Sequence, residues 1–236
     1  METAVKYIFS RVEKKYLITE SQYRAIMPVL NEHMHGDKYG FSTVCSTYVD
    51  TPDMRIIRAS IDAKAYKEKL RLRCYGVPSD SSPAFVELKK KYKGTVYKRR
   101  FGMPYGQALR MLYGGVPVPD TQMGREVGYF LRFYPGAAPM IDIFCERFAL
   151  FGNDDEEFRV TFDHNLRYRM EELDLRMGTH GRSILDGDKY VMEVKTAGGM
   201  PLWFASLLDE NGIFPHKFSK YRTAFETELA ERLGRG

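Results

Sequence analysis

Charged and apolar residues alternate with period two in several separate segments of this chain. The clearest case is residues 69–73, where Lys69, Arg71 and Arg73 alternate with Leu70 and Leu72. Such alternation puts the charged side chains on one face of a β-strand and the apolar ones on the other. The pattern recurs in five sets of positions: Arg11, Glu13 and Lys15; Lys69, Arg71 and Arg73; Glu87, Lys89 and Lys91, followed by Lys98 and Arg100; Arg159, Thr161 and Asp163, followed by Arg167 and Arg169; and Glu193 and Lys195.

These segments, and others rich in β-branched and aromatic residues, are predicted strands. They are residues 7–17, 41–50, 64–75, 84–92, 95–103, 140–151, 157–164 and 190–196. Apolar residues at helical spacing predict helices near residues 105–113, 125–134 and 202–210, and one after Ser219. A further helix is expected after Thr19, which has the capping-box spacing to Gln22. Pro28 is expected to kink or shorten that helix.

Strands outnumber helices, and the strand–helix–strand rhythm of parallel sheets is missing from the sequence. It therefore predicts an α+β fold built on an antiparallel sheet or barrel, with helices at the ends and in one middle insertion. The chain has 236 residues, of which 44% are hydrophobic and 28% charged. That composition is typical of a globular protein, and the length suits a single domain over residues 1–236.

The remaining bulk properties exclude several classes of protein. Three cysteines, Cys45, Cys74 and Cys145, are too few and too far apart for a disulfide framework or a zinc site, so we expect buried, reduced thiols. The N-terminal residues are too highly charged for a signal peptide, and no stretch approaches 18 consecutive apolar residues. The sequence thus predicts a cytoplasmic protein without a membrane span.

The charged faces have two interpretations. A single charged face is most often the solvated side of a half-exposed sheet. Here, however, basic residues dominate set after set, with an isolated Glu in several of them. If the sheet closes with its apolar side outward, the cations line a tunnel, where they repel one another unless a polyanion compensates them. Arg and Lys are the usual phosphate ligands, and a lone Glu among them suits a divalent metal that touches phosphate.

The segments together resemble the VTC domain, the polyphosphate polymerase branch of the triphosphate tunnel metalloenzymes. The resemblance covers nearly the whole chain, in the expected order. Its motifs are RVEKKYLI, KLRLRCYG, FVELKKKY, FCERFAL, FRVTFD, YVMEVKT and KFSKY.

The resemblance implies an eight-stranded antiparallel tunnel with flanking helices, and transfer of the ATP γ-phosphate onto a growing inorganic polyphosphate chain. It implies a divalent metal, Mn²⁺ or Mg²⁺, held by Glu193. The residues it implies for catalysis are Lys15, Arg71, Arg73, Lys89, Arg159 and Glu193. Further phosphate contacts are expected from Lys69, Lys91, Arg147, Arg167, Arg169, Lys195, Lys217, Ser219 and Lys220. Which of Arg167 and Arg169 faces the tunnel stays open.

One departure from the wider superfamily bears on the chemistry. Its hydrolytic and cyclase members open with Glu-x-Glu-x-Lys, whereas this chain has Arg11, Glu13 and Lys15. A cation in the first position weakens a second metal site and hence the case for a metal-activated water. The sequence therefore favours phosphate transfer over hydrolysis.

Three alternatives stay open. A tunnel-fold triphosphatase would share the same residues, and a non-catalytic module could bind polyphosphate or inositol polyphosphates. Nucleic-acid binding would need aromatic residues between the cations, a role open to Tyr75, Tyr92 and Tyr97, but it does not explain the period-two arrangement and is not expected. A membrane partner is possible, and polymer length, direction and oligomeric state are not predicted.

Overall fold

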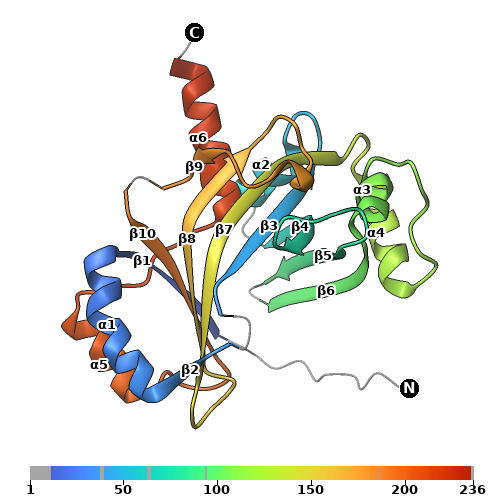
Figure 1. The fold of residues 1–236 in the computed structure, drawn as a ribbon. Helices are drawn as coiled ribbons and strands as arrows, with labels where there is room; N and C mark the ends of the chain where they lie inside the picture. The colour runs from blue at the N-terminus through green and yellow to red at the C-terminus, as the bar shows by residue number, and fades with distance from the viewer. Residues whose placement is uncertain (1–11, 38–39, 63–64, 94, 186, 235–236) are drawn as a thin grey trace. The chain divides into compact units, whose positions relative to one another are not determined.

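The computed structural model describes residues 12–37, 40–62, 65–93, 95–185 and 187–234, with side chains through residue 231 (Figure 1). The chain forms two compact units. The first unit comprises Met1–Phe41, Arg147–His164 and Gly187–Phe218. The second comprises Ser42–Glu146, Asn165–Asp186 and Ser219–Gly236.

The first unit is a four-stranded antiparallel arrangement with two helices. Its strands follow the hydrogen-bonding order β1-β10-β8-β7, and the short β2 pairs with β7. The elements are β1 (Val12–Thr19), α1 (Glu20–His33), β2 (Met34–Gly36), β10 (Lys189–Thr196), α5 (Leu202–Glu210), and the adjoining parts of β7 (Ala138–Gly152) and β8 (Arg159–Arg169).

Helices α1 and α5 cover one side of these strands (Figure 1). Tyr16 and Ile18 of β1 pack there with Ile26 and Leu30 of α1, and all four are almost fully buried. Helix α1 begins at the expected capping box, in which Thr19 accepts from the Gln22 amide and the Gln22 side chain accepts from the Thr19 amide. Pro28 lies inside this helix without ending it.

The second unit extends the antiparallel pattern through β3, β4, β5 and β6. Its hydrogen-bonding order is β8-β7-β3-β4-β5-β6, and β9 pairs with β8. The elements, besides its parts of β7 and β8, are β3 (Ser42–Asp50), α2 (Arg55–Asp62), β4 (Tyr66–Tyr75), β5 (Pro83–Tyr92), β6 (Thr95–Pro104), α3 (Tyr105–Leu112), α4 (Gln122–Phe133), the 3₁₀ turn η1 (Leu175–Met177), β9 (Arg182–Ser183) and α6 (Lys220–Gly234).

The apolar faces of β3, β4 and β5 form the core of this unit. Leu70, Leu72 and Val86 are fully buried and pack with residues of α3 and α4, including Ala108 and Val127. On β4 and β5 the opposite faces carry the charged residues, as the period-two pattern predicts.

The predicted fold class is confirmed: the structure is α+β, with an antiparallel sheet and flanking helices. Over the described residues the hydrogen-bonded path is open, and β1 and β6 are its end strands. All three cysteines are buried and free, as expected. No helix among the described residues is long and apolar enough to cross a membrane.

Four elements were not predicted: β2, α2, the 3₁₀ turn η1 and β9. Helix α2 follows β3 after a short connection, and the buried Asp50 carboxylate sets its start. That carboxylate accepts hydrogen bonds from the amides of Ile56 and Ile57. It also accepts one from the hydroxyl of Tyr221 in α6.

Candidate phosphate-binding faces

The first unit carries a face on which charges of both signs are paired, which we call the mixed face. The strand register places Lys15 opposite Glu193, and Glu13 opposite Lys195. Lys195 in turn lies opposite Arg159. The mixed face comprises Glu13, Lys15, Arg147, Arg159, Asp163, Glu193 and Lys195.

Glu193 lies between two lysines on the mixed face. The Lys15 amine is 3.1 Å from Glu193 Oε1, and the Lys195 amine is 3.8 Å from Glu193 Oε2. Lys15 also lies 3.7 Å from Glu13 Oε1. Burial of its amine lowers the pKa of Lys195, against the opposing effect of Glu193 and Glu13. A lysine with a lowered pKa gains from a second anion nearby, such as a phosphate.

The two arginines of the mixed face are held by other groups of the first unit. Arg147 donates two hydrogen bonds, of 2.6 and 2.7 Å, to the fully buried carboxylate of Asp163. The Arg159 guanidinium lies 4.8 Å from the ring centroid of Phe151. Both side chains are thus oriented by the protein before any ligand binds, which lowers the entropy cost of gripping one.

The mixed face offers a metal ion a single well-placed carboxylate. No group of three or more His, Cys, Asp or Glu side chains gathers at one point in the part of the chain that the structure describes. Mg²⁺ and Mn²⁺ in phosphoryl-transfer sites are commonly held by one or two carboxylates plus oxygens of the substrate phosphates. Glu193 fits that arrangement, because its two lysine neighbours also attract the phosphates that would complete the coordination.

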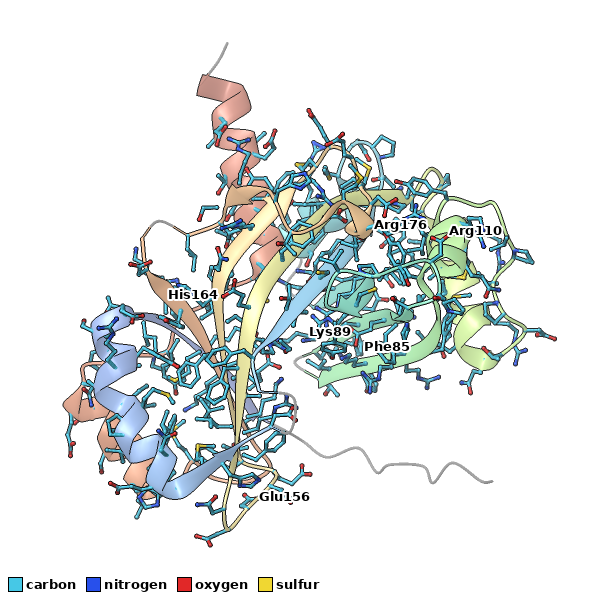
Figure 2. All side chains as sticks on the ribbon, viewed as in Figure 1. Phe85, Lys89, Arg110, Glu156, His164 and Arg176 are labelled. Atoms are coloured by element: carbon cyan, nitrogen blue, oxygen red, sulfur yellow. The ribbon has the colours of Figure 1, made fainter. Side chains whose placement is uncertain are left out.

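The second unit carries a different face, on β4, β5 and β6, which we call the cationic face. In the described residues of these strands, eight cationic side chains share it with one carboxylate. Figure 2 labels two of its positions on β5, Phe85 and Lys89. The cationic face comprises Lys67, Lys69, Arg71, Arg73, Glu87, Lys89, Lys91, Lys98 and Arg100.

Three lysines lie directly opposite one another across this face. Lys69 of β4 pairs with Lys89 of β5, and Lys89 pairs with Lys98 of β6. We call these three residues the lysine row. Like charges directly opposite across strands are destabilising. An anion of several charges would remove that penalty.

Glu87 is the buried carboxylate that holds the neighbouring cations. Its side chain is 1% exposed and lies 2.6 Å from Arg71 Nε, 2.7 Å from Lys98 Nζ and 3.8 Å from Arg73 Nε. Burial would raise the pKa of Glu87, but these three cations outweigh it and lower the pKa to about 2. Partial burial of its amine lowers the pKa of Lys98 to about 8, against the attraction of Glu87.

Tyr48 of β3 is a site residue that sequence reasoning missed. Arg71 Nη1 donates to its hydroxyl at 3.1 Å, and its ring stacks on Tyr221 with centroids 4.8 Å apart. Burial would raise the pKa of Tyr48, but Arg71, Arg73 and Lys69 lower it to about 8. The register offered a signal, because Tyr48 and Ser46 continue the face of Arg71 and Arg73 onto β3.

The other predicted phosphate ligands divide between the two units. Lys69 donates to Ser219 Oγ at 3.2 Å, so Ser219 lies at the cationic face, with Lys220 next to it at the start of α6. Ser219 also caps that helix, because the Arg222 amide donates to its hydroxyl. Lys91 shares the cationic face, opposite Lys67. Lys217 is exposed in the first unit, after a segment that pairs with β1 through the His216 amide and the Lys15 carbonyl.

Arg169 lies away from both faces. Its guanidinium is 6% exposed and bonded to Asp142, a buried carboxylate that also accepts from Thr47. It further donates to the carbonyls of Asp174 and Gly178. These contacts give Arg169 a place in the core, so the proposals below leave it out. Arg167 donates to Asn165, and its role stays a prediction. Arg11 lies outside the described residues.

Comparison with solved structures shows the fold. A candidate adenylate cyclase from Bacillus halodurans superposes with a TM-score of 0.55 at 14% sequence identity, over 89% of this chain and 93% of that one. A candidate adenylate cyclase from Vibrio parahaemolyticus gives 0.53 at 13% identity, over 91% and 97%. A candidate adenylyl cyclase from Hippeastrum, described as having a dominant triphosphatase activity, gives 0.50 at 14%, over 89% and 93%.

Sequence comparison identifies the family. No curated protein matches the chain significantly. Residues 10–228, however, match the VTC domain, which is nearly the full length. This stretch contains every motif that carried the resemblance, and it includes both charged faces. The chain therefore belongs to the VTC domain family.

Proposed function

We propose that this protein is a metal-dependent polyphosphate polymerase that transfers the γ-phosphate of ATP onto a growing inorganic polyphosphate chain. In this proposal each face binds phosphate groups: the cationic face through its Lys and Arg residues, and the mixed face through Lys15 and Lys195 beside Glu193, which holds the divalent metal. Membership of the VTC domain family supports the reaction class. The ion, Mn²⁺ or Mg²⁺, and a cytoplasmic location remain predictions.

The lysine row is the observation that carries the proposal. Lys69, Lys89 and Lys98 face one another across three strands. The buried Glu87, which interacts with Lys98, is already shared with Arg71 and Arg73. A polyphosphate chain carries a negative charge on each successive phosphate. It could therefore contact a cation on each of the three strands at once, whereas a single monovalent anion could not.

Phosphoryl transfer asks the protein mainly for positioning and charge neutralisation. Arg71 and Arg73 offer planar donor groups to phosphate oxygens, and Lys89 offers a point charge. Tyr48 adds a hydroxyl whose oxygen already accepts from Arg71, which leaves its proton for a phosphate oxygen. The nucleophile is the terminal phosphate of the polymer, which is anionic at neutral pH, so no side-chain nucleophile is required.

A divalent metal would supply further charge neutralisation on the transferred group. On the mixed face, Glu193 would bind it, and Lys15 and Lys195 would hold the phosphates that share it. Because two lysines lie so close to the Glu193 carboxylate, its affinity for a metal ion should be low in the absence of phosphate. We therefore expect metal and phosphate to bind cooperatively.

The decisive experiment is incubation of the purified protein with ATP and Mn²⁺, followed by gel electrophoresis with a phosphate-polymer stain. We expect a ladder of polymer whose formation requires the metal, and matching release of ADP. A Lys69→Gln/Lys89→Gln variant, which removes two cations of the lysine row, should lose the polymer.

The same assay separates the runner-up functions. Release of inorganic phosphate without polymer would replace the proposal with a triphosphatase, which is the activity named for the structurally similar Hippeastrum protein. Tight binding of polyphosphate with no turnover of ATP would indicate a binding module.

A further inference from the structure

The cationic face has two chemically different ends. Along β4 the alternation runs Lys67, Lys69, Arg71 and Arg73, and it ends at Tyr75. Along β5 the same face ends at Phe85, which lies opposite Arg73. Phe85 thus shares the face of the cations and not the apolar face of Val86 and Leu88. The end near Lys67 and Lys91 stays cationic, whereas the other end is aromatic.

The two aromatic rings at this end of the face pack against each other, and the ring of Tyr75 is open to solvent. Tyr75 and Phe85 meet edge to face, with centroids 6.1 Å apart and planes at 71°. The Tyr75 side chain is 53% exposed, and its hydroxyl makes no hydrogen bond to the described residues. Opposite Phe85 stands Gly102, which has no side chain, and the Arg100 guanidinium lies 4.8 Å from the Phe85 ring centroid. The exposed ring of Tyr75 thus leaves a flat aromatic surface open to a ligand, while its hydroxyl can remain hydrated.

We infer that Tyr75, with Phe85 beside it, is the platform on which the nucleobase of the phosphate donor stacks. This inference rests on the proposed function for the identity of the donor as a nucleoside triphosphate. A base joined to a phosphate chain needs an aromatic surface at the end of a row of cations, and this end of the face offers both. Successive cations on one strand face stand about 7 Å apart. The phosphates would thus run from Arg73 past Arg71 toward the lysine row.

The platform gives the reaction a direction. With the nucleoside at the Tyr75 end, the γ-phosphate points toward Lys69 and Lys89. The growing polymer then occupies the end that carries Lys67 and Lys91, where no base needs to be accommodated. The cations continue there because the polymer, unlike the nucleotide, consists of phosphate throughout.

The platform also predicts loose base selectivity. The residues in register with Tyr75 and Phe85 are Val44, Arg73 and Gly102. None of these three offers an amide or carboxylate for reading the edge of a base, and stacking by itself accepts any base. ATP and GTP should therefore bind with similar affinity, and the smaller pyrimidine nucleotides more weakly.

The test compares two ligands that differ in the presence of the nucleoside. Calorimetric titrations would measure the binding of adenylyl imidodiphosphate, a non-hydrolysable ATP analogue, and of inorganic tripolyphosphate, both with Mg²⁺ at fixed ionic strength. Tyr75→Ala should weaken the nucleotide about tenfold and tripolyphosphate less than twofold. Retained binding of tripolyphosphate shows that Tyr75→Ala is folded, and Tyr75→Phe should keep the wild-type affinity for both ligands because it keeps the ring.

Tyr92→Ala is the matched control. Tyr92 is 49% exposed and belongs to the same sheet, but it lies on the opposite face of β5. It should change neither affinity. Equal weakening of both ligands by Tyr75→Ala, or no weakening of the nucleotide, would overturn the platform.

The outcome is independent of whether the protein makes polymer. A wild-type protein that binds the nucleotide through Tyr75 but forms no polymer contradicts the polymerase and keeps the platform. A Tyr75→Ala variant that makes polymer with an unchanged KM for ATP contradicts the platform and keeps the polymerase.

Discussion

The mixed face and the cationic face use the same residue types in opposite proportions. On the mixed face, four cations accompany three carboxylates, and each carboxylate has a cation within 4 Å. On the cationic face, eight cations accompany Glu87 alone. The net charge of the mixed face is close to zero, whereas the cationic face has a large excess of positively charged residues.

The difference shows in what each carboxylate does. Glu87 is 1% exposed and holds three cations, so it is committed to the protein. The Glu193 side chain is 10% exposed, and its lysine neighbours are 25% and 29% exposed. These lysines can turn toward a phosphate and leave the carboxylate to a metal. Glu87 is therefore suited to stabilising the fold, and Glu193 to binding a metal ion.

The largest expected effect comes from removing the buried carboxylate. Glu87→Gln leaves Arg71, Arg73 and Lys98 without their shared partner, and breaking a buried charge network typically costs about 3–5 kcal/mol. Denaturant unfolding at neutral pH should show this loss. Glu193→Gln should cost about 1 kcal/mol or less, because its partners are more exposed. Equal losses in the two variants would erase the distinction between the faces.

Acid unfolding gives the same comparison a second readout. The pKa of Glu87 is lowered from an ordinary 4.5 to about 2, so its ionisation stabilises the fold above pH 4.5. That stability is lost as the pH falls from 4.5 toward 2. The Glu87→Gln variant, already without it, should show a shallower decline over this range.

Next in size is the loss of turnover in Glu193→Gln. Replacing the one carboxylate placed to hold the metal should lower the rate of polymer formation about 100-fold or more. Affinity for tripolyphosphate should persist or rise, because a negative charge is removed. Glu13→Gln is the matched control, since Glu13 is a more exposed carboxylate of the same face and lies 3.7 Å from the Lys15 amine. The rate of polymer formation by Glu13→Gln should fall less than a fewfold. Wild-type turnover in Glu193→Gln would mean that another residue holds the metal.

Much of the fold could be predicted because period two is a strong signal. Leu70 and Leu72 are buried, and Arg71 and Arg73 face the other way, as the alternation requires. The start of α1 could be predicted because the capping box of Thr19 and Gln22 spans only four residues. Helix α2 could not be predicted because the carboxylate at its start belongs to Asp50, which accepts from amides six and seven residues later. A partner at that distance leaves no local pattern.

The site was predictable only as far as the alternation held. Counting by two from Arg159 brings Arg169 to a charged face, but Asn165 adopts a left-handed backbone with φ of +50° and interrupts the count. Arg169 consequently lies against Asp142 in the core. Tyr48 was missed for a different reason: a tyrosine in a run of β-branched residues looks apolar until the register sets it beside Arg71.

A smaller effect should follow from neutralising one member of the lysine row. Lys89→Gln removes one charge-assisted phosphate contact, so tripolyphosphate should bind about ten- to thirtyfold more weakly. The free protein should be as stable as the wild type or slightly more so, because like charges opposite one another are relieved. Lys90→Gln, one residue along β5 and on its other face, should change the affinity little. A drop as large in Lys90→Gln would mean that net charge alone drives binding.

The smallest effect expected is a pH dependence that arises from two residues at the cationic face. Lys98 and Tyr48 both have pKa values of about 8. As the pH rises from 7 to 9, Lys98 loses its positive charge and Tyr48 becomes an anion, so both changes disfavour a phosphate ligand. At one unit above its pKa a group is about one-tenth protonated, so affinity for tripolyphosphate should fall by up to about tenfold. The ligand itself gains charge with pH and would act in the opposite sense. Lys98→Met should flatten the profile strongly and Tyr48→Phe in part. A full wild-type decline in both cationic-face variants would show that the titrating groups lie elsewhere, and the contrast between the two faces would then be one of charge number alone.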